Sequence, residues 1–101
     1  MVDLIKDNKE ALIKLCQKYD IQIMYVFGSA TSDQFNESSD VDILISFNEI
    51  PIEKYTDNYF GLHDELEQLF GRKVDLITER SLSNPYFIKG VEETKMLLYA
   101  A

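Results

Sequence analysis

The chain has 101 residues, 46% of them hydrophobic and 12% aromatic, which suffices for one domain with a buried core but not for two. Its 10 basic and 18 acidic residues give a formal net charge of −8. That charge argues against binding DNA or RNA through the phosphates, because such binding needs a basic face. No stretch approaches the ~20 apolar residues of a membrane helix. We therefore expect a single domain over residues 1–101 that binds neither nucleic acid nor membrane directly.

The cysteine count and the first residues indicate a reducing compartment. Cys16 is the single cysteine, so a disulfide scaffold or a cysteine-based zinc site within one chain is excluded. The first seven residues do not show the cationic segment and apolar run of a secretory signal. A cytoplasmic location is the simplest expectation.

Hydrophobic periodicity predicts an alternation of helices and strands. Residues 7–18 and 53–70 carry apolar side chains at the 3.6-residue spacing of amphipathic helices, with Gly71 placed to end the second one. Pro85 suits the first turn of a last helix that ends near Leu97. Three short apolar runs, rich in β-branched residues, are predicted strands: 21–27, 40–47 and 72–78.

The order of these elements predicts an α+β domain. A helix between the second and third strands favours a parallel, right-handed crossover, whereas the short link between the first two strands favours an antiparallel pair. We therefore expect a small mixed three-stranded sheet with flanking helices.

Three acidic residues stand where the strands would bring them together. Asp40 and Asp42 are two residues apart on one strand, so their carboxylates share a face of the sheet. Asp75 would reach the same end if the second and third strands are parallel neighbours. Ionised carboxylates this close repel one another unless some are protonated or a cation neutralises them. Oxygen-only ligation of this kind suits Mg²⁺ or Mn²⁺.

The pair Gly28-Ser29 follows the first strand and indicates an anion site. Glycine permits a tight turn and a close approach of a ligand, and a helical turn starting at Ser29 would direct its N–H groups outwards. An antiparallel pairing would place this turn beside Asp40 and Asp42. An anion site facing a carboxylate-bound metal describes a nucleoside triphosphate, and it predicts two-metal phosphoryl or nucleotidyl transfer.

These residues resemble the motif of the DNA polymerase β-like nucleotidyltransferase superfamily. The motif here is Gly28-Ser29, ten intervening residues, Asp40-Val41-Asp42, and a later acid, Asp75. The short length and the segments Gly-Arg-Lys-Val-Asp-Leu-Ile-Thr and Ser-Asn-Pro look most like the minimal nucleotidyltransferases, over nearly the whole chain. The resemblance implies that fold, with metal-binding Asp40 and Asp42. It also implies Asp75 as a third metal-binding acid that helps to deprotonate the acceptor hydroxyl. Gly28 and Ser29 would hold the triphosphate.

The same resemblance implies a partner. Members of this group are commonly antitoxins of helical HEPN ribonuclease toxins, and some transfer AMP from ATP to a tyrosine of the toxin. We therefore expect a Mg²⁺- and ATP-dependent enzyme with a HEPN-type toxin as partner, in a hetero- or homo-oligomer. One departure stands out: many relatives carry an arginine shortly after the Gly-Ser pair, where this chain reads Ala30-Thr31-Ser32-Asp33. The candidate replacements are Arg72, Lys73, Arg80 and Lys89.

Two other functions fit the same residues. A non-catalytic antitoxin could cover a ribonuclease by stoichiometric binding, and the charge of −8 suits masking a basic RNA-binding face. A small-molecule adenylyltransferase of the aminoglycoside type fits the acidic set but would need an acceptor-binding surface from elsewhere. We assign no chemistry to His63, expected as a partly exposed helix residue, and place Cys16 in the core. Tyr55, Tyr59 and Phe60 could pack in the core or stack on adenine, and their helical spacing favours the core.

Overall fold

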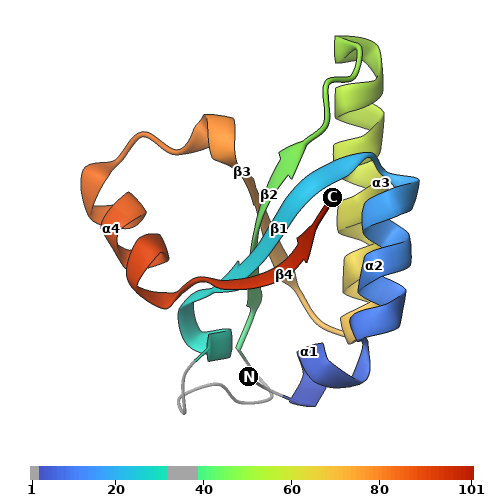
Figure 1. The fold of residues 1–101 in the computed structure, drawn as a ribbon. Coiled ribbons are helices and arrows are strands. Elements are labelled where there is room, and N and C mark those ends of the chain that lie inside the picture. The colour runs from blue at the N-terminus through green and yellow to red at the C-terminus, as the bar shows by residue number, and fades with distance from the viewer. Residues whose placement is uncertain (1–2, 32–38) are drawn as a thin grey trace.

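The computed structural model describes residues 3–31 and 39–101 and places helices on both faces of a central sheet (Figure 1). The elements, in chain order, are α1 (Asp3–Asp7), α2 (Lys9–Lys18), β1 (Ile21–Phe27), the 3₁₀ turn η1 (Gly28–Thr31), β2 (Val41–Phe47), α3 (Ile52–Phe70), β3 (Val74–Thr78), the 3₁₀ turn η2 (Glu79–Ser81), α4 (Pro85–Thr94) and β4 (Met96–Ala100). In Figure 1, α2 and α3 lie on one side of the sheet and α4 lies on the other.

The sheet has the strand order β3-β2-β1-β4. As predicted, β1 and β2 are antiparallel and β2 and β3 are parallel. In this register Asp42 of β2 lies between Phe27 of β1 and Asp75 of β3. The fold class is therefore confirmed as α+β with a mixed sheet.

The predicted number of strands is wrong, because a fourth strand closes the other side of β1. Met96–Ala100 forms β4, antiparallel to β1, with Val26 opposite Met96 and Met24 opposite Tyr99. The predicted last helix is accordingly too long: α4 ends at Thr94, and Lys95 is already extended (φ −64°, ψ 141°). Without β4, the backbone N–H and C=O groups on one side of β1 would lack partners in the sheet.

The remaining boundaries differ from the predictions by a few residues. The predicted first helix begins at Lys9, and Asn8 at its N-cap position donates its side-chain amide to the carbonyl of Leu4 (2.7 Å) instead of capping α2. Gly71 ends α3 in the left-handed conformation (φ 64°), as predicted. This turn delays the start of β3 to Val74.

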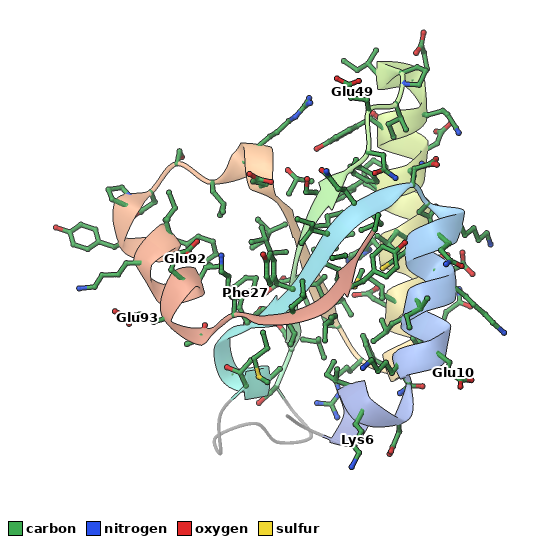
Figure 2. All side chains as sticks on the ribbon, viewed as in Figure 1. Lys6, Glu10, Phe27, Glu49, Glu92 and Glu93 are labelled. Carbon is green, nitrogen blue, oxygen red and sulfur yellow. The ribbon has the colours of Figure 1, made fainter. Side chains whose placement is uncertain are left out.

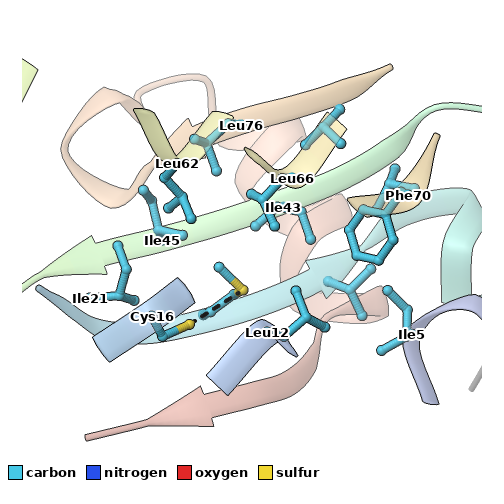
Figure 3. Packing of buried hydrophobic residues seen from close by; sticks show 14 of the residues in the cluster. Ile5, Leu12, Cys16, Ile21, Ile43, Ile45, Leu62, Leu66, Phe70 and Leu76 are labelled. Atoms are coloured by element: carbon cyan, nitrogen blue, oxygen red, sulfur yellow. Dashed lines mark hydrogen bonds between the residues drawn. The ribbon is translucent and has the colours of Figure 1, made fainter. Parts of the chain in front are cut away.

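The main core fills the space between the sheet and the helices α2 and α3 (Figure 3). Its fully buried side chains include Ile5, Leu12, Cys16, Ile21, Met24, Val26, Val41, Ile43, Ile45, Leu62 and Leu66. The Cys16 thiol contacts the Met24 sulfur (3.8 Å), and burial raises the pKa of Cys16 to about 12. Cys16 is therefore a core residue, as expected, and an unreactive one.

A smaller apolar cluster lies on the other face, beneath α4. It consists of the buried residues Phe27, Leu44 and Val91. In Figure 2, Phe27 points from β1 toward α4, while Glu93 lies on the outer side of that helix. Because side chains alternate along β2, the face that carries Leu44 also carries Asp42. The acidic residues therefore share the α4 side of the sheet.

The outer edge of β3 is sealed by side chains of α3. The Val74 N–H donates to Glu67 Oε2 (2.9 Å), and the Val74 carbonyl oxygen lies 2.9 Å from His63 Nε2. The Tyr59 hydroxyl donates to the Leu76 carbonyl. These three residues recur every four positions, so they form one stripe along the helix. They satisfy backbone groups that an edge strand would otherwise expose to another strand.

Among the described residues, no helix is long and apolar enough to cross a membrane.

Candidate active site

Two of the three predicted carboxylates meet across neighbouring strands. Asp42 and Asp75 are direct partners in the parallel β2–β3 register, so their side chains leave the same face of the sheet. Asp42 is partly buried, whereas Asp75 is exposed. The predicted juxtaposition of these two acids is therefore present in the structure.

The surroundings of Asp42 disfavour its ionised form. Burial is the largest cause, followed by the charge of Asp75, a hydrogen bond with Asp75, and the charge of Asp40. Together they raise the pKa of Asp42 from 3.8 to about 6. A shift of this origin marks a partly dry site with unbalanced negative charge, which is a common property of functional sites.

Asp40 lies at the rim of the site. It precedes β2, where the Val41 N–H already donates to the Lys73 carbonyl (3.1 Å). The Lys73 ammonium lies 4.0 Å from Asp40 Oδ2, and the two side chains are 70% and 41% exposed. An exposed pair at this separation is worth at most ~1 kcal/mol. Asp40 can therefore exchange Lys73 for another cation at little cost.

The acids fit a hard divalent cation by their chemistry, although they do not form a closed cage. Over residues 3–31 and 39–101, no three His, Cys, Asp or Glu side chains are grouped around one metal position. Asp42 and Asp75 nevertheless bring carboxylate oxygens together, and Asp40 adds negative charge nearby. Carboxylate oxygens with unbalanced charge are suitable ligands for Mg²⁺ or Mn²⁺.

Gly28 packs directly against Asp42, because β1 ends beside the start of β2. Its backbone is left-handed (φ +70°), and a Cβ on it would lie 2.5 Å from Asp42 Oδ2. Only glycine fits both requirements. The predicted contact between this turn and the acids is therefore present at Asp42.

The turn itself differs from the prediction in its start and in its donors. It is a 3₁₀ turn that begins at Gly28, one residue earlier than predicted, and the Thr31 hydroxyl donates to the Gly28 carbonyl (2.8 Å). The Gly28 N–H donates to the Thr94 hydroxyl oxygen (3.0 Å), so the start of the turn is tied to α4. Sequence reasoning missed Thr94, since no local signal relates two residues that are 66 positions apart.

Of the four candidate replacements for the missing arginine, Arg72 and Lys73 lie near Asp40, whereas Arg80 and Lys89 lie elsewhere. Lys73 lies at Asp40, and the Arg72 guanidinium donates to the Ser39 carbonyl (3.1 Å), just before that acid. Arg80 lies 6.0 Å from the Tyr55 ring, at the other end of β3. Lys89 is exposed on α4. Ser32 and Asp33 lie outside the described residues.

A cavity at the opposite end of the sheet is separate from the acids. It has a volume of about 900 Å³ and is lined by residues that include Phe47, Ile52 and Arg80. Asp42 and Asp75 instead lie near the other end of β2 and β3, where the Asp75 side chain is exposed.

Carboxylates on adjacent parallel strands beside a glycine turn, in an α+β domain, fit a nucleotidyltransferase. The chain belongs to the polymerase beta nucleotidyltransferase family, whose family model matches residues 10–101. The predicted family and its class of enzyme, a nucleotidyltransferase, are thus confirmed.

Two relatives in sequence come from archaea. The chain is 37% identical over 91 residues, 90% of its length and 87% of the relative's, to a Methanocaldococcus jannaschii protein provisionally named protein adenylyltransferase MJ0128. It is 38% identical over 71 residues to the protein adenylyltransferase MntA of Thermococcus cleftensis, a match that covers 70% of this chain and 69% of that one.

Solved structures with the same fold include a minimal nucleotidyltransferase, itself provisionally identified. The two chains are 27% identical and superpose with a TM-score of 0.68, and the alignment covers 93% of this chain and 92% of the other. A chain of a toxin–antitoxin complex with AMP-PNP gives a TM-score of 0.72 at 24% identity, covering 93% of this chain and 74% of that one. This second likeness concerns the fold alone.

Proposed function

We propose that this protein transfers AMP from ATP to a hydroxyl of a partner protein, a tyrosine of a HEPN ribonuclease toxin, and so acts as its antitoxin. The observation that carries the proposal is the contact of Gly28 with Asp42, which lies beside Asp75. The names of its relatives, protein adenylyltransferases, support the reaction. The toxin–antitoxin complexes among the structural neighbours support the kind of partner.

Each site residue has a role in this proposal. Asp40, Asp42 and Asp75 would hold Mg²⁺ or Mn²⁺, which supplies charge neutralisation at the phosphates and activation of the attacking oxygen. Gly28 and Ser29 would hold the triphosphate, Gly28 by allowing its close approach to Asp42. The acceptor oxygen forms a bond to the α-phosphorus of ATP. The bond between the α-phosphorus and the oxygen that bridges to the β-phosphate breaks, and pyrophosphate leaves. Asp75 helps to remove the hydroxyl proton.

A protein acceptor suits the site better than a nucleic acid. The net charge of −8 repels phosphate backbones. Asp75 is exposed, so a side chain presented by another protein can reach it. A basic RNA-binding surface on the partner would match the charge of this chain.

The test uses ATP labelled at the α-phosphate, Mg²⁺, and a candidate HEPN protein from the same genome. We expect label on a tyrosine of the partner with wild type and loss of the label with Asp42→Asn. Asp57→Asn, which changes an exposed aspartate on α3, is the matched control and should retain activity. Transfer by Asp42→Asn at the wild-type rate, or no transfer by wild type, would contradict the proposal.

A second candidate function is a stoichiometric antitoxin without catalysis. One observation favours it: Gly28-Ser29 is followed by Ala30-Thr31, where many nucleotidyltransferases of this kind carry an arginine. The discriminating variants are Asp40→Ala and Asp42→Ala, tested for neutralisation of the toxin in cells. Full neutralisation at normal dose would favour binding over AMP transfer.

A further inference from the structure

We infer that Thr94, at the C-terminal end of α4, is a positioning residue for the nucleotide: its hydroxyl holds the Gly28 N–H and fixes the turn η1 against Asp42. This inference rests on the proposed function, because it concerns the turn that would bind the triphosphate and says which residue fixes the conformation of that turn. Thr94 itself does not touch the reacting atoms.

The hydrogen bonds of Thr94 fix the direction of its hydroxyl. The hydroxyl donates to the Gly90 carbonyl one helical turn earlier (2.8 Å). A hydroxyl has one proton to donate, so its oxygen is left to accept from the Gly28 N–H (3.0 Å). Serine can form both bonds in the same way. Valine, with almost the same shape as threonine, can form neither.

The helix that carries Thr94 is anchored to β1, immediately before the turn. Phe87 of α4 contacts the Phe27 ring edge-on, with centroids 5.9 Å apart and planes at 83°. Val91 is 2% exposed and packs in the cluster with Phe27 and Leu44. Thr94 is therefore presented to Gly28 from a fixed support rather than from a free chain end.

Gly28 is held on three sides. Thr31 donates to its carbonyl, Thr94 accepts from its N–H, and Asp42 Oδ2 occupies the space beside its α-carbon. Of these three contacts, Thr94 supplies the link to α4. Loss of this link leaves the acids unchanged but releases the turn, so nucleotide binding should weaken while divalent-ion binding stays the same.

The test compares Thr94→Val and Thr94→Ser in the full chain. We expect Thr94→Val to bind Mg²⁺-ATP about tenfold more weakly in calorimetric titration, the effect of one lost hydrogen bond of ~1.4 kcal/mol. Thr94→Ser should bind within about twofold of wild type. Binding of Mn²⁺ alone should be equal in all three proteins. Hydrogen exchange of the Gly28 amide should accelerate in Thr94→Val and stay slow in Thr94→Ser.

A second substitution separates positioning from general stability. A Cβ at Gly90 would meet no atom within 4 Å, so Gly90→Ala should strengthen α4 without a new contact. If Thr94 positions the turn, Thr94→Val/Gly90→Ala regains thermal stability but not ATP affinity. Recovery of ATP affinity in the double variant, or wild-type affinity in Thr94→Val, would overturn the inference.

The two proposals fail in different ways. Wild type that neither binds Mg²⁺-ATP nor transfers AMP contradicts the proposed function. In that case the Gly28 amide still decides the inference: exchange unchanged by Thr94→Val means that Thr94 does not hold the turn.

Discussion

Gly28 and Gly71 need the same backbone conformation, with φ angles of +70° and +64°, but have different surroundings. A Cβ at Gly28 would lie 2.5 Å from Asp42 Oδ2, whereas a Cβ at Gly71 would have no neighbour within 4 Å. The two glycines therefore separate the cost of backbone strain from the cost of crowding the acids.

We expect Gly28→Ala to reduce AMP transfer by about a hundredfold or more, because the added methyl group displaces the Asp42 carboxylate. Gly71→Ala should cost ~1–2 kcal/mol of stability from its left-handed backbone and leave transfer unchanged. The measurements are the labelled-ATP assay and thermal unfolding of both variants. An equal loss of transfer in the two variants would show that strain alone is responsible.

Asp42 also controls how stability depends on pH. Its pKa is raised in the folded state to about 6, so the folded chain holds a proton that the unfolded chain has already lost. The contribution of this proton to the free energy of unfolding is therefore fully present below the ordinary pKa of 3.8, and it is lost as the pH rises from there through 6. The two-unit shift corresponds to at most ~3 kcal/mol.

Asp42→Asn should consequently make the metal-free protein more stable than wild type at about pH 7.5, by ~1–3 kcal/mol. The gain should almost disappear at about pH 3, because Asp42 is then mostly protonated in both states. Urea unfolding in the presence of a chelator measures the difference, and Asp57→Asn serves as the control. A gain that does not change with pH would contradict the raised pKa.

At the scale of elements, the stripe of Tyr59, His63 and Glu67 on α3 gives β3 a partner on its outer side. Glu67→Ala would leave the Val74 N–H without its acceptor (2.9 Å in the structure). We expect a loss of ~1–3 kcal/mol in unfolding free energy, since a backbone donor would lose its partner. Glu67→Gln keeps an oxygen acceptor and should lose less. Equal stability of Glu67→Ala and wild type in urea unfolding would show that water replaces the carboxylate.

The sequence predicted the elements whose pattern is local. The strands β1 and β2, the long helix α3 and its end at Gly71 follow from periodicity and from one glycine. The pairing of Asp42 with Asp75 followed from the crossover helix, because parallel neighbours bring the same strand ends together.

What the sequence did not predict depends on distant partners. Met96–Ala100 is an uncharged run directly after a helix, and periodicity cannot distinguish a further helical turn from a strand there. Only β1, whose paired residues lie 70 to 77 positions earlier, makes it a strand. Thr94 is a second example, because its role depends on the distant Gly28. The stripe on α3 is a third, because Tyr59 and His63 have the spacing of ordinary helix residues and only β3 gives them partners.

On the scale of the whole molecule, the first strand needs the last one. β1 is central in the sheet, and β4 covers its second side, with Leu98 and Tyr99 packed against the main core. Deletion of residues 96–101 should therefore abolish cooperative thermal unfolding, since β1 loses its partner and the core loses two side chains. Leu97→Ser, at a side chain that is 57% exposed, is the control and should unfold as wild type does. A cooperative transition in the shortened chain would show that three strands suffice.

The pairing of β1 with β4 also has a consequence for the time at which the protein becomes competent during translation. Gly28 leaves the ribosome well before Thr94, which follows it by 66 residues, and before the strand β4 that flanks β1. A nascent chain that already contains all three acidic residues still lacks the contacts that shape the turn beside them. The site is therefore completed only after Thr94 and β4 have left the ribosome, so nascent chains that end before these residues should be inactive.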